Sequence, residues 1–154
     1  MLYVTFRIGI DRYALDVDQV EEVLPLVAIK AIPHAPRGVA GLFDFRGAAV
    51  PAIDLTELAL GFPAPRRIST RILLVQAPVV SSEHRRLGLI VEKATDVLRM
   101  EPSEFVEPGV RSTGAPWLGR VAKSPEGELV QLVRVQRLLP PAVLEALHAE
   151  ATED

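Results

Sequence analysis

The chain has 154 residues, of which 17 are basic and 20 are acidic, so its formal net charge is -3. This length suits one domain that buries a large core without a disulfide or a metal. The absence of cysteine excludes disulfide frameworks, thiol catalysis and thiolate metal sites, and it favours a reducing cytoplasm. The nearly balanced charge argues against binding to nucleic acid, and no apolar run reaches the ~18 residues that cross a bilayer.

Hydrophobic residues make up 49% of the chain, and its mean hydropathy of +0.24 is high for a small soluble domain. Such a surplus is typical of a protein interface, although a dense core of valine, leucine and isoleucine explains it equally well. Both interpretations stay open at this point.

The chain opens on a predicted β-hairpin. From Leu2 to Ile10, apolar and polar residues alternate with a period of two, which predicts a half-buried strand. A tight turn then leads into a second strand at Tyr13–Val17. Asp16 or Asp18 is suited to cap a short helical turn that ends at Pro25. The apolar side of this turn is expected to carry Val20, Val23 and Leu24.

A second hairpin is predicted after a proline-rich loop. Two strand-like runs, at residues 39–45 and 48–55, are joined by a corner at Arg46-Gly47. Pro51 lacks a backbone donor, so we place it at a sheet edge or a bulge. Asp54 is expected to act as the N-cap of a single helical turn.

The second half of the chain repeats this plan of short strands and ends in a helix. Two weak internal echoes, of residues 15–24 with 89–98 and of 53–58 with 133–138, indicate two similar small barrels. Pro140-Pro141 opens the final helix, whose apolar side carries Val143, Leu144 and Leu147. The strands of this half are expected at residues 71–76, 87–91, 94–100, 118–122 and 129–135.

Residues suited to metal binding or nucleophilic catalysis are scattered. His34, His84 and His148 are far apart in sequence, and none has a second ligand at helical metal spacing. Ser81-Ser82-Glu83-His84 holds a hydroxyl, a carboxylate and an imidazole, but triads are assembled across a fold and not from neighbours, so a solvated loop is the better interpretation. We therefore expect no metal and no cofactor.

A carboxylate pair offers an alternative with catalytic chemistry. Asp44 and Asp54 flank the Arg46-Gly47 corner, and both could serve acid–base chemistry if they faced one cleft. Together with His34 they define a rival hypothesis, a small β-barrel hydrolase. A second rival is a peptide-binding SH3-like module, which the aromatic content of 5% makes weak.

The most specific pattern runs from Gly41 to Leu55 and reads Gly-Leu-Phe-Asp-Phe-Arg-Gly-Ala-Ala-Val-Pro-Ala-Ile-Asp-Leu. At this segment the sequence closely resembles the CheW-like domain, whose recurring pattern is Gly-x-x-Asn-Leu-Arg-Gly-x-x-Val-Pro-x-x-Asp-Leu. Asp44 and Phe45 replace the usual Asn-Leu. Residues 13–23, 88–98 and 129–139 also resemble the family. The sequence at residues 43–45 and 116–119 is similar to that of adaptors of non-flagellar pathways such as Wsp surface sensing.

The resemblance implies an all-β fold of two intertwined SH3-like, five-stranded β-barrel subdomains with short helices, including a C-terminal helix. The whole chain, residues 1–154, would form one CheW-like domain. We expect the first subdomain at about residues 11–68, and the second at about 71–139 together with the N-terminal strand 2–10. The C-terminal helix is expected at about residues 140–149.

The resemblance also implies a function. A CheW-like protein is a non-catalytic, cytoplasmic adaptor that couples the tip of a methyl-accepting chemoreceptor to the regulatory domain of a CheA-type histidine kinase, and protein contacts associate it with membrane-anchored receptor arrays. Neither nucleic acid nor membrane insertion is expected. Carried over by position, the partner-binding candidates are Val20, Glu22, Gly41, Phe43 and Arg46, and the structural motif comprises Gly47, Pro51 and Asp54.

Overall fold

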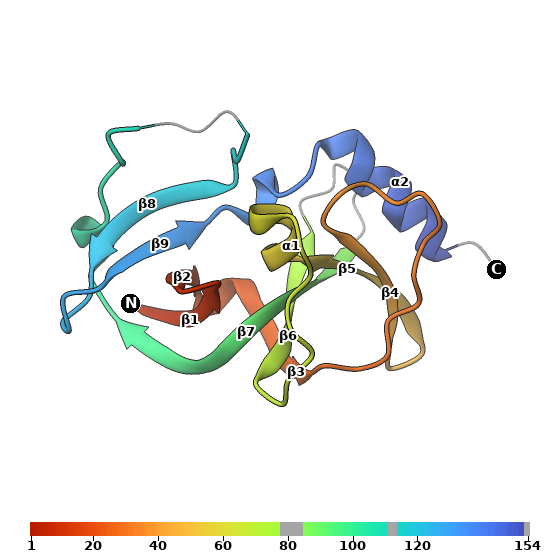
Figure 1. Cartoon of the computed structure of the whole chain (residues 1–154), viewed down its shortest axis with the longest axis horizontal. Helices are drawn as coiled ribbons and strands as arrows, with labels where there is room; N and C mark the ends of the chain where they lie inside the picture. Colours follow the sequence, from red (N-terminus) through yellow and green to blue (C-terminus); the bar gives the residue numbers. More distant parts are fainter. Residues whose placement is uncertain (78–84, 111–113, 153–154) are drawn as a thin grey trace.

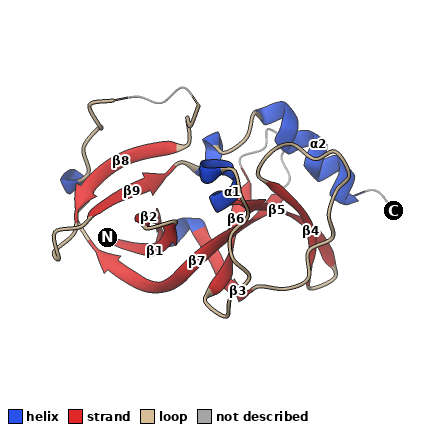
Figure 2. Ribbon diagram, viewed as in Figure 1, coloured by secondary structure: helices blue, strands red, loops and turns tan. Residues whose placement is uncertain are grey.

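The computed structural model describes residues 1–77, 85–110 and 114–152, and these residues form mainly β-strands (Figures 1 and 2). The strands are β1 (Leu2–Ile8), β2 (Asp11–Asp16), β3 (Val20–Pro25), β4 (Val39–Phe45), β5 (Ala48–Asp54), β6 (Thr70–Ala77), β7 (Arg85–Arg99), β8 (Leu118–Lys123) and β9 (Leu129–Val133). The helices are α1 (Leu55–Leu60), α2 (Pro141–Thr152) and three 3-10 turns, η1 (Val17–Gln19), η2 (Pro102–Glu104) and η3 (Val135–Arg137).

The long strand β7 belongs to two barrels. Its first half pairs antiparallel with β6 and parallel with β5, and its second half pairs antiparallel with β1. One barrel therefore contains β4, β5, β7, β6 and β3, and the other contains β7, β1, β2, β9 and β8. Figure 1 shows the two lobes side by side with β7 running from one to the other. The predicted all-β fold of two intertwined five-stranded barrels is confirmed.

A bulge lets β7 serve both barrels. The register with β1 shifts between Thr5, which faces Asp96, and Arg7, which faces Glu92. Lys93 lies in the extra stretch and has a positive φ of 52°. Because a bulge bends a strand and increases its twist, one continuous strand replaces the two that the sequence predicts at residues 87–91 and 94–100.

The sequence predicts that the first subdomain begins at about residue 11, which would separate β1 from β2. In the structure these two strands form one hairpin. β2 pairs antiparallel with β1 along its whole length and parallel with β9, so it belongs with the second barrel and not with the first. Conversely, β6 and the first half of β7 belong with β3, β4 and β5. Each barrel is thus built from both halves of the sequence, because an antiparallel hairpin shares its backbone hydrogen bonds and stays in one sheet.

The predicted helical turn over Val20, Val23 and Leu24 is wrong. The helical segment is only η1, which Asp16 caps by accepting a hydrogen bond from the Asp18 backbone N–H at 2.9 Å. Half-buried and exposed residues then alternate along β3. Apolar residues three and four apart fit a helix face, but this stretch is also rich in valine, which favours a strand that can pair with β6.

The two barrels share one hydrophobic core. A single cluster of buried residues includes Phe6 and Leu15 from the second barrel and Leu73 and Leu89 from the first. Leu144 of α2 packs into the same cluster. Smaller clusters fill the interior of each barrel. The shared core makes the two lobes one packed unit, because a core at close-packed density transmits displacements.

The C-terminal helix α2 is fastened to this unit. It packs against β5, and Leu144 and Leu147 are buried, as the sequence predicts. His148 is also buried, and its two ring nitrogens lie 2.8 Å from the Leu144 carbonyl oxygen and 3.0 Å from the Arg86 carbonyl oxygen of β7. The imidazole therefore links α2 to the beginning of β7.

Asp54 organises the junction between β5 and α1. Its Oδ1 accepts hydrogen bonds from the backbone N–H groups of Thr56 and Glu57 at 3.0 and 3.1 Å, which confirms the predicted N-cap. Its Oδ2 accepts a third bond from the Ala64 N–H at 2.9 Å. The residue is 1% exposed, so water cannot replace these bonds.

We expect Asp54→Ala to lower the free energy of unfolding by about 2–4 kcal/mol, because three backbone donors lose a buried acceptor. Asp54→Asn should cause a smaller loss, since its amide oxygen still accepts at the N-cap while its NH2 group faces the Ala64 donor. Urea denaturation followed by the emission of Trp117, the one tryptophan of the chain, measures both. An unchanged midpoint for Asp54→Ala would contradict the assigned role.

Candidate functional site

The β4–β5 hairpin ends in a tight two-residue turn. Phe45 pairs with Ala48, and the central residues Arg46 and Gly47 have φ values of 49° and 88°. Two successive positive φ angles are typical of a type I′ turn, whose twist matches that of the paired strands. Asp44 supports the turn, since its Oδ1 accepts a hydrogen bond from the Gly47 N–H at 3.0 Å. The predicted corner at Arg46-Gly47 is confirmed.

Arg46 stands on this turn as an exposed but oriented cation. Its side chain is 72% exposed, and its Nη2 donates to both carboxylate oxygens of Glu22 at 3.2 and 3.3 Å. Its guanidinium carbon lies 4.7 Å from the centroid of the Phe45 ring. The ion pair and the ring contact together restrict the guanidinium, which lowers the entropy lost when a partner binds it. The structure thus brings together two of the predicted site residues, Arg46 and Glu22.

The other predicted partner-binding residues lie inside the first barrel or at its edge. Gly41 is buried with φ of 144°, and a Cβ there would lie 2.0 Å from the Lys30 carbonyl oxygen. Phe43 is 2% exposed, and its ring packs against Gly88. Val20 is half-buried and packs on the shared core. Gly41 and Phe43 therefore shape β4 from within, and only Val20, Glu22 and Arg46 offer side-chain surface.

Two residues that the sequence analysis did not single out join the same corner. Arg86 of β7 pairs with Glu21 of β3 at 3.1 Å, and its guanidinium carbon lies 5.2 Å from the Phe45 ring centroid. Glu21 and Arg86 are 65 positions apart. Sequence patterns within a strand carry no signal for such a pair, because it depends on how β3, β6 and β7 align.

The residues of the hydrolase hypothesis have separate structural roles. Both carboxylate oxygens of Asp54 accept backbone hydrogen bonds, so this group is engaged in capping α1. Asp44 is exposed and supports the hairpin turn. His34 lies exposed in the loop before β4, in a groove along α2 whose lining includes neither aspartate. The Ser81–His84 segment lies outside the described residues.

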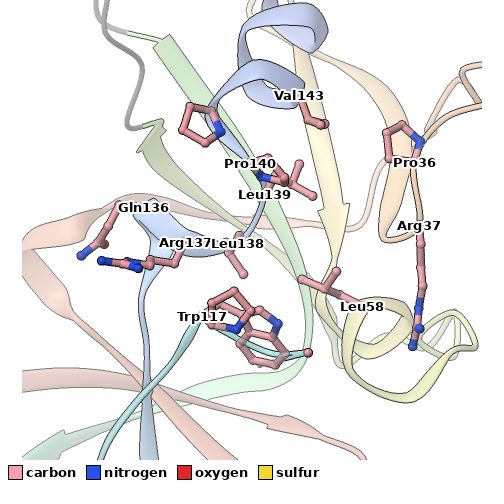
Figure 3. A pocket seen from close by; sticks show the side chains of 13 residues that line it. Pro36, Arg37, Leu58, Trp117, Gln136, Arg137, Leu138, Leu139, Pro140 and Val143 are labelled. Carbon is pink, nitrogen blue, oxygen red and sulfur yellow. The ribbon is translucent and has the colours of Figure 1, made fainter. Parts of the chain in front are cut away.

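An apolar hollow of about 590 Å³ lies where the two barrels and both α-helices approach one another (Figure 3). Leu58 of α1, Trp117 ahead of β8 and Leu138 after η3 point into it. Arg37 and Arg137 lie at its margin. Trp117 itself is buried, so the hollow is walled by core residues of both lobes.

Among the described residues, the structure has no helix with the length and apolar character required to span a membrane.

Comparison with protein families decides the classification. The model of the CheW-like domain matches residues 2–142, which is nearly the whole chain. The chain belongs to the CheW-like domain family. The matched residues include every strand of both barrels and the first residues of α2, so the match is not confined to the Arg46 hairpin.

Curated relatives and a solved structure agree with this membership. A chemotaxis protein CheW from Rhizobium meliloti is 27% identical over 144 residues, which cover 93% of this chain and 90% of that protein. A probable chemotaxis protein CheW from Rhizobium etli is 30% identical over 105 residues, or 68% of this chain and 64% of that protein. The crystal structure of scaffolding protein TtCheW from Thermoanaerobacter tengcongensis has a TM-score of 0.77 at 25% identity, covering 90% and 87% of the two chains.

Substitution of the two hairpin glycines separates packing from turn geometry. We expect Gly41→Ala to destabilise the fold by more than about 4 kcal/mol, because the new Cβ would overlap the Lys30 backbone. Gly47→Ala is the matched control, since its Cβ would meet nothing within 4 Å and only the positive φ is unfavourable, at a cost of about 1 kcal/mol. Thermal unfolding of both variants measures the difference, and similar midpoints would contradict this account.

Proposed function

We propose that this protein is a non-catalytic adaptor of a bacterial chemosensory complex, in which it couples a chemoreceptor to a CheA-type histidine kinase. Membership of the CheW-like family over residues 2–142 supports this function. Two relatives bear the name CheW with a chemotaxis description, and the similar crystal structure is of a scaffolding protein. Such a protein acts through free energy of association alone and requires surfaces in place of an active site.

The observation that carries the proposal is the oriented, exposed guanidinium of Arg46 at the hairpin tip. In this proposal Arg46 makes a charge-assisted contact with the receptor, and Glu22 and Val20 on the neighbouring β3 extend the contact surface. An arginine held in a fixed direction donates several hydrogen bonds without losing much rotamer freedom. Gly41 and Phe43 contribute indirectly, because they set the position of β4 beneath the tip.

The shared core explains how one small protein can hold two partners in a defined arrangement. The receptor contacts the Arg46 corner of the first barrel, and the kinase's regulatory domain packs against barrel ends. Because β7 and one hydrophobic cluster run through both lobes, the two docking surfaces keep a constant distance and orientation. A rigid spacer of this kind passes small shifts of one partner on to the other.

We expect Arg46→Glu to weaken binding to the cytoplasmic hairpin of a chemoreceptor from the same organism by at least about tenfold, because it reverses an oriented charge. The fold should persist, since an exposed ion pair contributes only about 0.2–1 kcal/mol. Arg120→Glu is the matched control, because Arg120 is also exposed and paired with a glutamate, Glu107, but lies on β8 of the other barrel. Titration calorimetry with each purified variant measures the effect.

The double variant Arg46→Glu with Glu22→Arg restores an ion pair between positions 22 and 46, with the two charges exchanged. If Arg46 and Glu22 act only within the protein, through their ion pair, this variant should bind the receptor hairpin as the original protein does. Contact with the receptor predicts instead that binding stays weak. Normal binding by Arg46→Glu, or equal loss in Arg120→Glu, would refute the proposed role of the corner.

A further inference from the structure

Two arginines share one aromatic ring at the corner described above. The guanidinium carbons of Arg46 and Arg86 lie 4.7 and 5.2 Å from the centroid of Phe45, although they come from the β4–β5 turn and from β7. Each is paired with one of two consecutive glutamates on β3, Arg46 with Glu22 and Arg86 with Glu21. The one ring and the two consecutive acidic side chains thus hold both cations at this corner.

The cations are the more exposed members of these pairs. The side chain of Arg46 is 72% exposed against 38% for Glu22, and that of Arg86 is 42% exposed against 31% for Glu21. A protein that approaches this surface therefore meets the guanidinium groups first. Negatively charged groups on that protein are complementary to these exposed cations.

Both guanidiniums also keep hydrogen-bond donors for a partner. Arg86 donates to both carboxylate oxygens of Glu21 through Nε, and its Nη2 lies 3.1 Å from Glu21 Oε2, whereas Arg46 donates to Glu22 through Nη2. A guanidinium carries five N–H donors, and among the described residues the bonds to the glutamates do not use the Nη1 group of either side chain. A partner carboxylate can bind there without displacing the glutamates that orient the arginines.

A contact with α2 holds the backbone of Arg86 in place. Its carbonyl oxygen lies 3.0 Å from Nε2 of the buried His148 in α2. Arg86 also pairs in register with Gln76 of β6, whose side-chain amide donates to Glu21 at 3.3 Å. The residue therefore begins from an anchored position, and little backbone freedom is lost when its side chain binds.

We propose that Arg86 is a second receptor-contacting residue, and that the receptor segment presents two carboxylates, one to Arg86 and one to Arg46. This inference rests on the proposed function and adds a residue and a partner chemistry to it. Carboxylates three or four residues apart on one face of a helix lie close enough together to address two neighbouring guanidiniums. The Phe45 ring acts as the platform that holds both cations toward them.

The test is a set of affinity measurements with the cytoplasmic hairpin of a chemoreceptor from the same organism as the probe. Arg86→Ala should weaken binding roughly tenfold and reduce its dependence on salt concentration. Arg86→Lys should bind with intermediate affinity, because lysine retains the charge but not the planar fork. Arg120→Ala serves as the control for removal of an exposed, paired arginine elsewhere. Circular dichroism and thermal midpoints verify that each variant is folded.

Exchanging the charges of Arg86 and Glu21 distinguishes direct contact of Arg86 with the receptor from structural support by its ion pair. Arg86→Glu combined with Glu21→Arg keeps an ion pair between β3 and β7, so a purely structural Arg86 predicts normal binding, whereas a contacting Arg86 predicts weak binding. If Arg46→Ala loses binding and Arg86→Ala does not, the inference fails while the proposed function stands. If neither variant loses binding, the proposed receptor surface itself fails.

Discussion

The architecture depends on β7 being long enough, and bent enough, to belong to two barrels. Its first half closes the barrel of β3, β4, β5 and β6, and its second half closes that of β1, β2, β8 and β9. The bulge near Lys93 allows the change of direction without breaking the strand. If that stretch were regular, the two sheets would diverge, and the core that joins the lobes would lose one of its walls.

This sharing gives the proposed adaptor its mechanical character. A chain of two barrels joined by a linker would let its partners rotate independently. Here one hydrophobic cluster contains residues of both barrels and of α2, so the lobes move together. The Arg46 corner then sits on a rigid body, and its orientation relative to any surface of the second barrel is a property of the fold.

Turns, helix caps and the C-terminal helix were predictable from the sequence, whereas the pairing of strands between distant segments was not. The Arg46-Gly47 turn, the Asp54 cap and the α2 helix follow from residues adjacent in the chain, and the structure contains all three. The identity of β3 was missed because its apolar spacing suits a helix as well as a strand. The grouping of β2 and the Glu21–Arg86 pair depend on alignment between distant segments, which local periodicity does not encode.

The left-handed backbone at Arg46 has a consequence for the role proposed for this residue. Arginine is held there at φ 49°, a conformation that glycine or asparagine adopts at less cost in a type I′ turn. Glycine or asparagine at this position would therefore favour thermal stability, whereas the proposed contact with a receptor requires the guanidinium of arginine. In the proposed adaptor, the hairpin tip is therefore a place where stability of the fold and recognition of a partner favour different amino acids.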